Sequence, residues 1–356
     1  MDDRDKPRPS VILAWLRPPP PYFLGGAEIS QWLLARRLAE CGYEVRYIGS
    51  FEEPWPGGQV IRDKLTTDLR DRGAKLRPVG DGGVGYEWDG IKCELLPGQG
   101  VEAALRRGIS EDRYPLVVSS QEGSDALLTT AREAGCATVG WIHSVSEVGM
   151  LPAEAGADYL LCVSRFVRRE LRDRRGVEGV LSYPPFAPPP SPGLAPEGRR
   201  MTIINPIPAK GGELFVELAR MLPETGFTAV DGWYRVELPA LGNLHRFHRP
   251  APMEDIWRDT RLLLAPSRVP EGFGRVCVEA GGRGIPTIAS RRGGLPEAVG
   301  RGGMLLKSDD PRVWVRAIDE ALEPTTYREL SSLAREHAAR FERDIVLELR
   351  DARILV

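Results

Sequence analysis

Lysine, histidine and cysteine are all scarce in this sequence. Only six of its 48 basic residues are lysines, so a lysine in a glycine-rich turn stands out. There are four histidines; His245 and His248 are near neighbours, but no cysteine or carboxylate stands beside them at the spacing of a zinc site. We therefore predict no structural metal.

The five cysteines are widely spaced and include no C-x-x-C pair. Isolated cysteines in apolar or helical contexts indicate free thiols in a reducing compartment, which predicts a cytoplasmic protein. Residues 1–6 lack the basic-then-apolar layout of a secretory signal. No apolar run approaches the roughly 20 residues that cross a bilayer.

Excess charge of one sign is also missing, since the formal net charge is −2. Such a balance provides no basic surface for a polyanion, so nucleic acid is not expected as a partner. Residues 164–175 are strongly basic and are interpreted as a solvated helix face. A contact with a membrane surface stays open, although Glu170 and Asp173 within this segment weaken that interpretation. The sequence leaves the oligomeric state open.

Strand-like apolar runs alternate with amphipathic helical runs along the chain, which predicts a parallel α/β architecture. The length of 356 residues suits two domains, each with its own core. In the first half, the strands are predicted at residues 11–16, 45–48, 116–119, 138–142 and 159–163. A second alternating series begins at 201–204 and continues to about residue 323, and residues 327–356 are predicted to be helical.

The positions of glycine and proline predict where loops lie and where helices end. A helix after the first strand is predicted to end at Gly42, because glycine favours the residue that terminates a helix. Residues 80–85 are rich in glycine and predict a surface loop. Proline lacks the amide donor and restricts φ, so residues 183–197 predict a semi-rigid linker. The first helix should bury one apolar stripe formed by Ile29, Leu33, Leu34, Leu38 and Cys41.

Two glutamates provide the strongest functional signal, in the stretch Glu271-Gly-Phe-Gly-Arg-Val-Cys-Val-Glu279. Residues 261–266 predict a buried strand and residues 276–282 the opening of a helix. Both carboxylates should then face the crevice outside the carboxyl ends of the strands, where open α/β sheets bind ligands. Carboxylates accept hydrogen bonds from a vicinal diol, and free amides face an anion, so the pattern favours a ligand with hydroxyl and phosphate groups. Taken alone, the two glutamates could equally be solvated surface charges.

The residues that follow are Gly-Ile-Pro-Thr-Ile-Ala-Ser290, Arg291-Arg-Gly-Gly-Leu-Pro-Glu-Ala-Val-Gly300 and Gly-Gly-Met-Leu-Leu306. With the two glutamates, they resemble the retaining GT-B-fold glycosyltransferases of family 4, also called group 1 glycosyltransferases. The similarity is clearest over residues 203–323. It implies two Rossmann-like α/β domains facing across a cleft. The expected parts are an acceptor-side domain at 1–186, a linker at 187–198, a nucleotide-sugar-binding domain at 199–330, and C-terminal helices at 331–356, the last packing on the N-terminal domain.

The resemblance also implies roles for the residues of the donor site. Glu279 would accept hydrogen bonds from both ribose hydroxyls, and Glu271 would bind hydroxyls of the donor sugar. Lys210, in a turn that opens a helix, would stabilise charge on the departing diphosphate. The backbone amides expected to line the donor belong to Phe273, Gly274, Arg275 and Val276.

Two further positions carry a resemblance to the family. His143 ends a predicted strand and would hydrogen-bond the donor sugar, although a lone histidine there is more often structural. Gly25 and Gly26 would line the junction of donor and acceptor; on residues alone, they are equally a tight turn without a ligand. Their spacing is not G-x-G-x-x-G, so a nicotinamide oxidoreductase is disfavoured.

One departure from the family pattern concerns the phosphates. Relatives usually have Gly-Arg after the strand that precedes the lysine, whereas this chain has Asn205-Pro206. Either Lys210 acts with helix amides alone, or another arginine such as Arg275 substitutes, or activity is low.

The function expected from the resemblance is metal-independent, retaining transfer of a sugar. The donor would be a nucleotide-diphosphate sugar of the UDP or GDP type, and no cofactor is expected. The acceptor would be a natural product or a cell-envelope glycan or lipid of a bacterium. Two alternatives remain: another GT-B enzyme such as a sugar-nucleotide epimerase or a phosphorylase, and a non-catalytic relative that binds nucleotide sugars.

Overall fold

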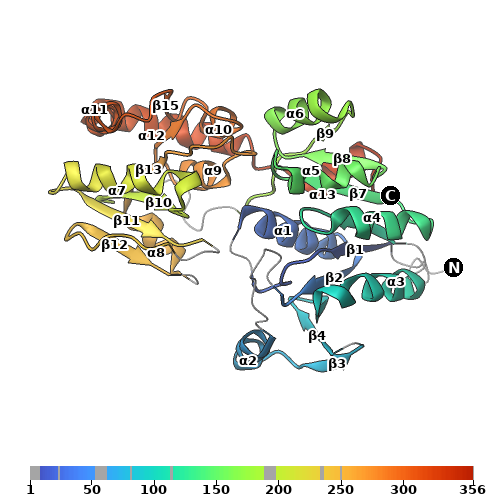
Figure 1. The fold of residues 1–356 in the computed structure, drawn as a ribbon. Helices are drawn as coiled ribbons and strands as arrows, with labels where there is room; N and C mark the ends of the chain where they lie inside the picture. The colour runs from blue at the N-terminus through green and yellow to red at the C-terminus, as the bar shows by residue number, and fades with distance from the viewer. Residues whose placement is uncertain are drawn as a thin grey trace.

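The computed structural model describes residues 9–22, 25–52, 62–80, 82–112, 115–187, 198–232, 236–248 and 251–355. These residues form two α/β units that lie side by side, each built around its own sheet (Figure 1). Residues 188–197 of the expected linker lie outside the described residues. Within the described ranges, no helix has the length and apolar character needed to cross a bilayer.

The first sheet contains nine strands among the described residues, in the order β3-β4-β5-β2-β1-β6-β7-β8-β9. Strands β5 to β9 in this order pair in parallel, and β3, β4 and β5 pair in antiparallel fashion. The strands are β1 (Ser10–Ala14), β2 (Glu44–Ser50), β3 (Arg77–Val79), β4 (Gly83–Trp88), β5 (Ile91–Leu96), β6 (Leu116–Ser119), β7 (Thr138–Ile142), β8 (Tyr159–Cys162) and β9 (Val180–Leu181).

The second sheet is parallel throughout its described part, in the order β12-β11-β10-β13-β14-β15. The chain reverses its direction of strand addition between β10 and β13, and ligands bind at such a switch point, outside the carboxyl ends of the strands. The strands are β10 (Arg200–Ile204), β11 (Gly226–Val230), β12 (Leu244–Phe247), β13 (Thr260–Ala265), β14 (Thr287–Ser290) and β15 (Gly303–Leu306).

Helices cover both sheets, as buried parallel strands require. Those of the first unit are α1 (Gly26–Glu40), α2 (Arg62–Asp71), α3 (Val101–Asp112), α4 (Ser124–Glu133), α5 (Glu147–Glu154) and α6 (Arg165–Arg175). Those that follow β10 are α7 (Gly212–Met221), α8 (Met253–Asp259), α9 (Arg275–Gly282), α10 (Leu295–Val299), α11 (Pro311–Leu322), α12 (Pro324–Ala339) and α13 (Ile345–Asp351), and two short 3-10 turns are η2 (Gly98–Gly100) and η3 (Pro208–Lys210).

Two local predictions were wrong. Gly83 and Gly85 were expected in a surface loop but lie buried in β4. An added Cβ would come within 2.8 Å of Leu96 at Gly83 and within 2.8 Å of Val79 at Gly85. The glycines therefore reflect close packing inside a hairpin, a cause that composition alone does not reveal.

The second error concerns the face that α1 buries. Ile29 and Leu33 are only partly buried, whereas the polar residues Glu28, Ser30 and Gln31 are buried. The predicted stripe rested only on the spacing of apolar residues along the helix. In the structure, α1 also packs against α13, and the hydroxyl of Ser30 meets a side chain of the second unit.

The end of the chain crosses from the second unit to the first. Helix α13 packs against α1 beside the first sheet (Figure 1). Its N-cap residue Asp344 accepts a hydrogen bond from Nε of Arg37, at 3.0 Å, and Nε of Arg350 donates to the hydroxyl of Tyr43, at 3.2 Å. Within residues 327–355, α12 and α13 are helical as expected, with a break between them and a non-helical end after Asp351.

The anchor of α13 can be tested with Asp344→Ala. This change removes the N-cap of α13, because Oδ1 of Asp344 accepts a hydrogen bond from the amide of Val346 at 3.0 Å. It also removes the ion pair between Asp344 and Arg37. We expect the free energy of unfolding to fall by about 1–2 kcal/mol in urea titrations. Asp319→Ala, at an exposed position of α11, should change it by less than about 0.5 kcal/mol.

The same variant predicts a pH dependence. Hydrogen bonding from Arg37 lowers the pKa of Asp344 in the folded protein. Stability from a lowered carboxyl pKa is present above the ordinary value of about 3.9 and is lost as the pH falls through the folded value. The stability difference between wild type and Asp344→Ala should therefore shrink below about pH 4, and a constant difference down to pH 2 would contradict this account.

Candidate functional site

Lys210 and Glu271 meet at the carboxyl edge of the second sheet. Lys210 ends η3 after β10, and Glu271 lies on the loop after the neighbouring strand β13. Nζ of Lys210 donates to Oε2 of Glu271, and the hydroxyl of Ser267 donates to Oε1. The side chain of Glu271 is 13% exposed and that of Lys210 is 32% exposed. The structure thus brings two predicted residues into contact at the rim of the expected crevice.

The glycines of the Gly-Gly-Leu-Pro-Glu segment support the loop that carries Glu271. The amide of Gly294 donates to the carbonyl oxygen of Glu271 at 2.7 Å. Gly293 has φ of 57°, and a Cβ there would lie 2.3 Å from the same oxygen. Glycine is required because a side chain at residue 293 would displace the loop.

Glu279 lies on α9, one turn after Arg275. Nη2 of Arg275 is 3.2 Å from Oε1 of Glu279, and the glutamate side chain is 25% exposed. The helix begins after Gly274, which has φ of 102°. As a glycine, this N-cap residue has no side chain that could accept a hydrogen bond from the first amides of the helix. Since the first amides of a helix lack partners inside the helix, those of Arg275 and Val276 can face a ligand. The ring of Phe273 is buried, so only the backbone of this residue can do the same.

His143 follows β7 in the first unit. Its Nε2 atom is buried and has no hydrogen-bond partner among the described residues. Burial, followed by the charges of Arg275 and Arg17, lowers the pKa of His143 to about 3. The imidazole is therefore neutral near pH 7 and suits a hydrogen bond to a ligand hydroxyl.

The loop that carries Glu271 docks directly on the first unit. The carbonyl oxygen of His143 would lie 2.0 Å from a Cβ at Gly272. The hydroxyl of Ser164, which also caps α6, donates to the carbonyl of Gly272 at 2.6 Å. The carboxylate of Glu297 accepts a hydrogen bond from the amide of Arg165 at 2.9 Å. Ser164, Arg165 and Glu297 were not predicted as site residues, because only the docking of the units brings them together.

The two N-terminal glycines of the prediction have different surroundings. A Cβ at Gly26 would lie 2.9 Å from Cδ of Arg275, in the second unit. A Cβ at Gly25 would instead meet the carboxylate of Glu28 on its own helix, at 2.2 Å. Gly26 thus belongs to the junction with α9, and Gly25 belongs to the turn that opens α1.

Asn205 and Pro206 stand where the resemblance led us to expect Gly-Arg. Asn205 has φ of 62°, and its Oδ1 atom is buried without a partner in the described part of the chain. Arg275 does not point to Lys210: it meets Glu279 and the hydroxyl of Ser30, at 3.0 Å. The proposal that Arg275 replaces the missing cation on the phosphates therefore has no support from its placement.

Two other arginines were not singled out from the sequence: Arg268, on the loop that carries Glu271, and Arg292, which contacts this loop. Nη1 of Arg292 donates to the carbonyl of Ser267 at 2.8 Å, and its Nη2 pairs with Asp309 at 2.8 Å. Arg268 pairs with Glu213 at 3.2 Å. Each arginine already has a carboxylate partner, so neither is an unengaged cation.

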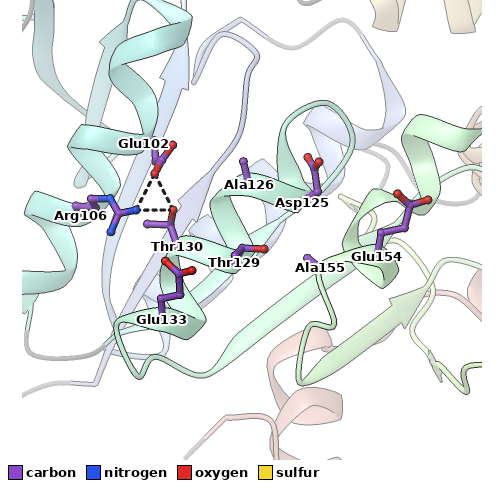
Figure 2. A pocket seen from close by; sticks show the side chains of 9 residues that line it. All are labelled: Glu102, Arg106, Asp125, Ala126, Thr129, Thr130, Glu133, Glu154 and Ala155. Carbon is purple, nitrogen blue, oxygen red and sulfur yellow. Dashed lines mark hydrogen bonds and ion pairs between the residues drawn. The ribbon is translucent and has the colours of Figure 1, made fainter.

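Other polar clusters lie away from this edge. In the part of the chain that the structure describes, no three histidine, cysteine or acidic side chains gather in a way that could hold a metal ion. All five cysteines fall within the described ranges, and each is a free thiol. Figure 2 shows a depression on the first unit between α3, α4 and α5, where Glu102, Arg106 and Thr130 bond to one another. It is lined by Glu102, Arg106, Asp125, Ala126, Thr129, Thr130, Glu133, Glu154 and Ala155.

Known proteins support the resemblance suggested by the motifs. Residues 232–324 match the family model of group 1 glycosyl transferases. The D-inositol 3-phosphate glycosyltransferase of Corynebacterium diphtheriae is 37% identical over 110 residues, which cover 29% of this chain and 26% of the relative. That of Gordonia bronchialis is 39% identical over 98 residues, covering 27% and 21%. The chain spans about a quarter of the length of these curated relatives.

Solved structures resemble the whole chain. Anabaena HepE in complex with UDP-glucose aligns with a TM-score of 0.75 and 16% identity, over 97% of this chain and 98% of that one. Sucrose-phosphate synthase from Thermosynechococcus elongatus aligns with a TM-score of 0.68 and 16% identity, over 98% of each chain. The GT-B fold class and the resemblance to group 1 glycosyltransferases are thus confirmed.

The neutral state of His143 predicts how stability depends on pH. Because its folded pKa of about 3 lies below the ordinary value of about 6.5, the unfolded chain takes up the proton first as the pH falls. The stability linked to His143 is therefore fully present above about pH 6.5 and is lost towards pH 3. Between pH 7 and pH 5, wild type should lose about 2 kcal/mol more than His143→Phe in urea titrations. Equal losses in both proteins would show that the imidazole is not held neutral.

Proposed function

We propose that this protein is a retaining glycosyltransferase that moves a sugar from a nucleotide-diphosphate sugar to an acceptor bound by the first unit. The observation that carries this proposal is the contact of Lys210 with Glu271 at the sheet edge, next to the surface where Gly272 meets His143. One cation and one carboxylate at that place suit a diphosphate joined to a polyhydroxylated sugar. The UDP-glucose complex of HepE, a protein of the same fold, agrees with such a donor.

The donor would lie along the loop and the first turn of α9. Lys210 would leave Glu271 for the diphosphate, where it offsets the charge that develops as the leaving group departs. Glu271 would then accept hydrogen bonds from the sugar hydroxyls, and the neutral His143 would bond to the same sugar from the first unit. Glu279 would hold the ribose, because its half-buried carboxylate lies on the helix that begins at this loop.

The reaction needs stabilisation of a cationic, oxocarbenium-like sugar and of an anionic leaving group. Preorganised charges and amides can supply much of this stabilisation without a protein nucleophile. We propose that the acceptor oxygen attacks on the face that the diphosphate leaves. A phosphate oxygen takes the acceptor proton, and the anomeric configuration is retained. NMR of the product tests this step, since the opposite anomer would exclude it.

A second candidate is a protein that binds nucleotide sugars without turning them over. It is favoured by the absence of a cation at Asn205 and by the engagement of Arg275 with Glu279 and Ser30. Incubation with a panel of nucleotide sugars separates the candidates, because an enzyme without its acceptor should slowly hydrolyse its donor. A thermal-shift screen should first identify the donor, since a ligand at about 100 times its dissociation constant stabilises by about 2.7 kcal/mol.

The assigned roles predict distinct effects of three substitutions. Glu279→Ala should raise the Kd for the nucleoside diphosphate about tenfold or more in calorimetry, because charge-assisted hydrogen bonds of about 1.5–3 kcal/mol each are lost. Glu271→Ala and Lys210→Ala should mainly lower kcat for transfer, by about a hundredfold.

Glu320→Ala, an exposed change on α11, is the matched control and should leave the Kd and kcat unchanged. An unaltered Kd in Glu279→Ala would remove the ribose assignment. An unaltered kcat in both Glu271→Ala and Lys210→Ala would remove the proposed donor site.

A further inference from the structure

Arg275 is buried at the junction of the two units, where its guanidinium meets three separate segments. Nη1 donates to the hydroxyl of Ser30 on α1, at 3.0 Å, and to the carbonyl of Pro185, at 2.7 Å. Nη2 lies 3.2 Å from Oε1 of Glu279. The guanidinium carbon stands 4.4 Å from the ring centre of Phe186. The arginine side chain is 8% exposed, so it is the more deeply buried member of its pair with Glu279.

The free-energy cost of burying the Arg275 guanidinium depends on its hydrogen bonds and on its ion pair. Burial of an arginine is costly unless its donors are hydrogen-bonded and its charge is paired. Nε of Arg275 is already buried without a partner among the described residues. Glu279 supplies the neighbouring charge, while Ser30 supplies an acceptor from the first unit. Ser30 is in place only when that unit is docked, so the surroundings of Arg275 change with the docking of the two units.

The start of α1 contacts Arg275 closely. The close approach of Gly26 to Cδ of Arg275 leaves no space for a side chain at residue 26. The hydroxyl of Ser30 donates to the carbonyl of Gly26 at 2.6 Å, which orients its oxygen lone pairs to accept from Nη1 of Arg275. The start of α1 thus holds Arg275 by shape and by a directed hydrogen bond.

The arrangement determines how much of the Glu279 carboxylate is available. With Nη1 held by Ser30 and Pro185, the arginine engages Oε1 of Glu279 through Nη2. Oε2 can then accept hydrogen bonds from a ligand. An undocked arginine can instead rotate and bind both carboxylate oxygens, since guanidinium and carboxylate favour a bidentate pair. It would then compete with the hydroxyl groups of a ligand.

We infer that Arg275 is a positioning residue that couples docking of the two units to the affinity of Glu279 for the nucleotide. This inference rests on the proposed function, because it takes the ribose as the ligand of Glu279. It gives Arg275 a role other than phosphate binding. It also makes Ser30, which lies in the other unit, a determinant of nucleotide affinity.

The experiment uses the whole chain and two buried helical serines, of which Ser30 contacts Arg275 and Ser331 donates to a different segment. Ser30→Ala removes the acceptor for Nη1. Ser331→Ala is the matched control, since Ser331 is also a buried helical serine whose hydroxyl donates to a glycine carbonyl, that of Gly284 at 2.7 Å. Calorimetry with UDP and with GDP gives the Kd. We expect Ser30→Ala to weaken binding about tenfold, and Ser331→Ala to change it less than about twofold.

Combining Ser30→Ala with Glu279→Ala distinguishes coupling from general loosening of the structure. If Ser30 acts through Glu279, the double variant should bind no more weakly than Glu279→Ala alone, because neighbours in one network are not additive. A purely structural serine would weaken both backgrounds equally. Equal weakening, or an unchanged Kd in Ser30→Ala, overturns the inference.

Arg275→Met provides an independent variant. Replacing a buried cation with an apolar side chain of similar length should leave the thermal midpoint near that of wild type. Because no guanidinium is then left to compete for Glu279, adding Ser30→Ala to Arg275→Met should change the Kd by less than about twofold. A rise of about tenfold in the Kd when Ser30→Ala is added to Arg275→Met would also overturn the inference. Failure of the proposed function has a different result: wild type itself would bind neither UDP, GDP nor any nucleotide sugar, and the inference would end with it.

Discussion

The site depends on how closely the loop after β13 approaches the first unit. The carbonyl oxygen of His143 lies where a Cβ at Gly272 would be, at 2.0 Å, so the two units can meet at this distance only if residue 272 is glycine. The hydroxyl of Ser164 then reaches the carbonyl of Gly272. This single contact places Glu271 beside the end of β7. It also brings the start of α1 against α9, and the aromatic rings at the junction close around Phe273.

Charges at the junction are arranged in pairs. Lys210 lies with Glu271 at the open edge, and Arg275 lies with Glu279 deeper between the units. The difference in exposure matters, because a half-exposed lysine can exchange its carboxylate for a phosphate at little cost, whereas a buried arginine cannot. The neutral state of His143 follows from the same arrangement, since burial and two neighbouring arginines disfavour a third cation. The junction therefore holds one partly exposed cation, Lys210, and one buried cation, Arg275.

Several elements could be predicted from the sequence because their causes are local. The parallel strands are short apolar runs between helical segments, a pattern that indicates buried strands. Gly42, with φ of 88°, follows the end of α1 as expected. The hairpin of β3 and β4 could not be predicted, since its glycines serve contacts with Val79 and Leu96 rather than a turn. The buried face of α1 was missed for a related reason: Ser30 is buried against an arginine 245 positions away.

The sequence by itself determined the alternation of elements, the placement of Lys210, Glu271 and Glu279 at helix starts and strand ends, and the resemblance carried by their spacing. These features depend on neighbours within one βα unit, where periodicity and turn chemistry act over a few residues. Only the tertiary structure decided which side chains meet across the junction, and that Arg275 serves Glu279 and Ser30 rather than the phosphate position. Such contacts depend on how the two sheets are placed relative to each other. Local patterns in the sequence do not determine that placement, because they act over only a few residues.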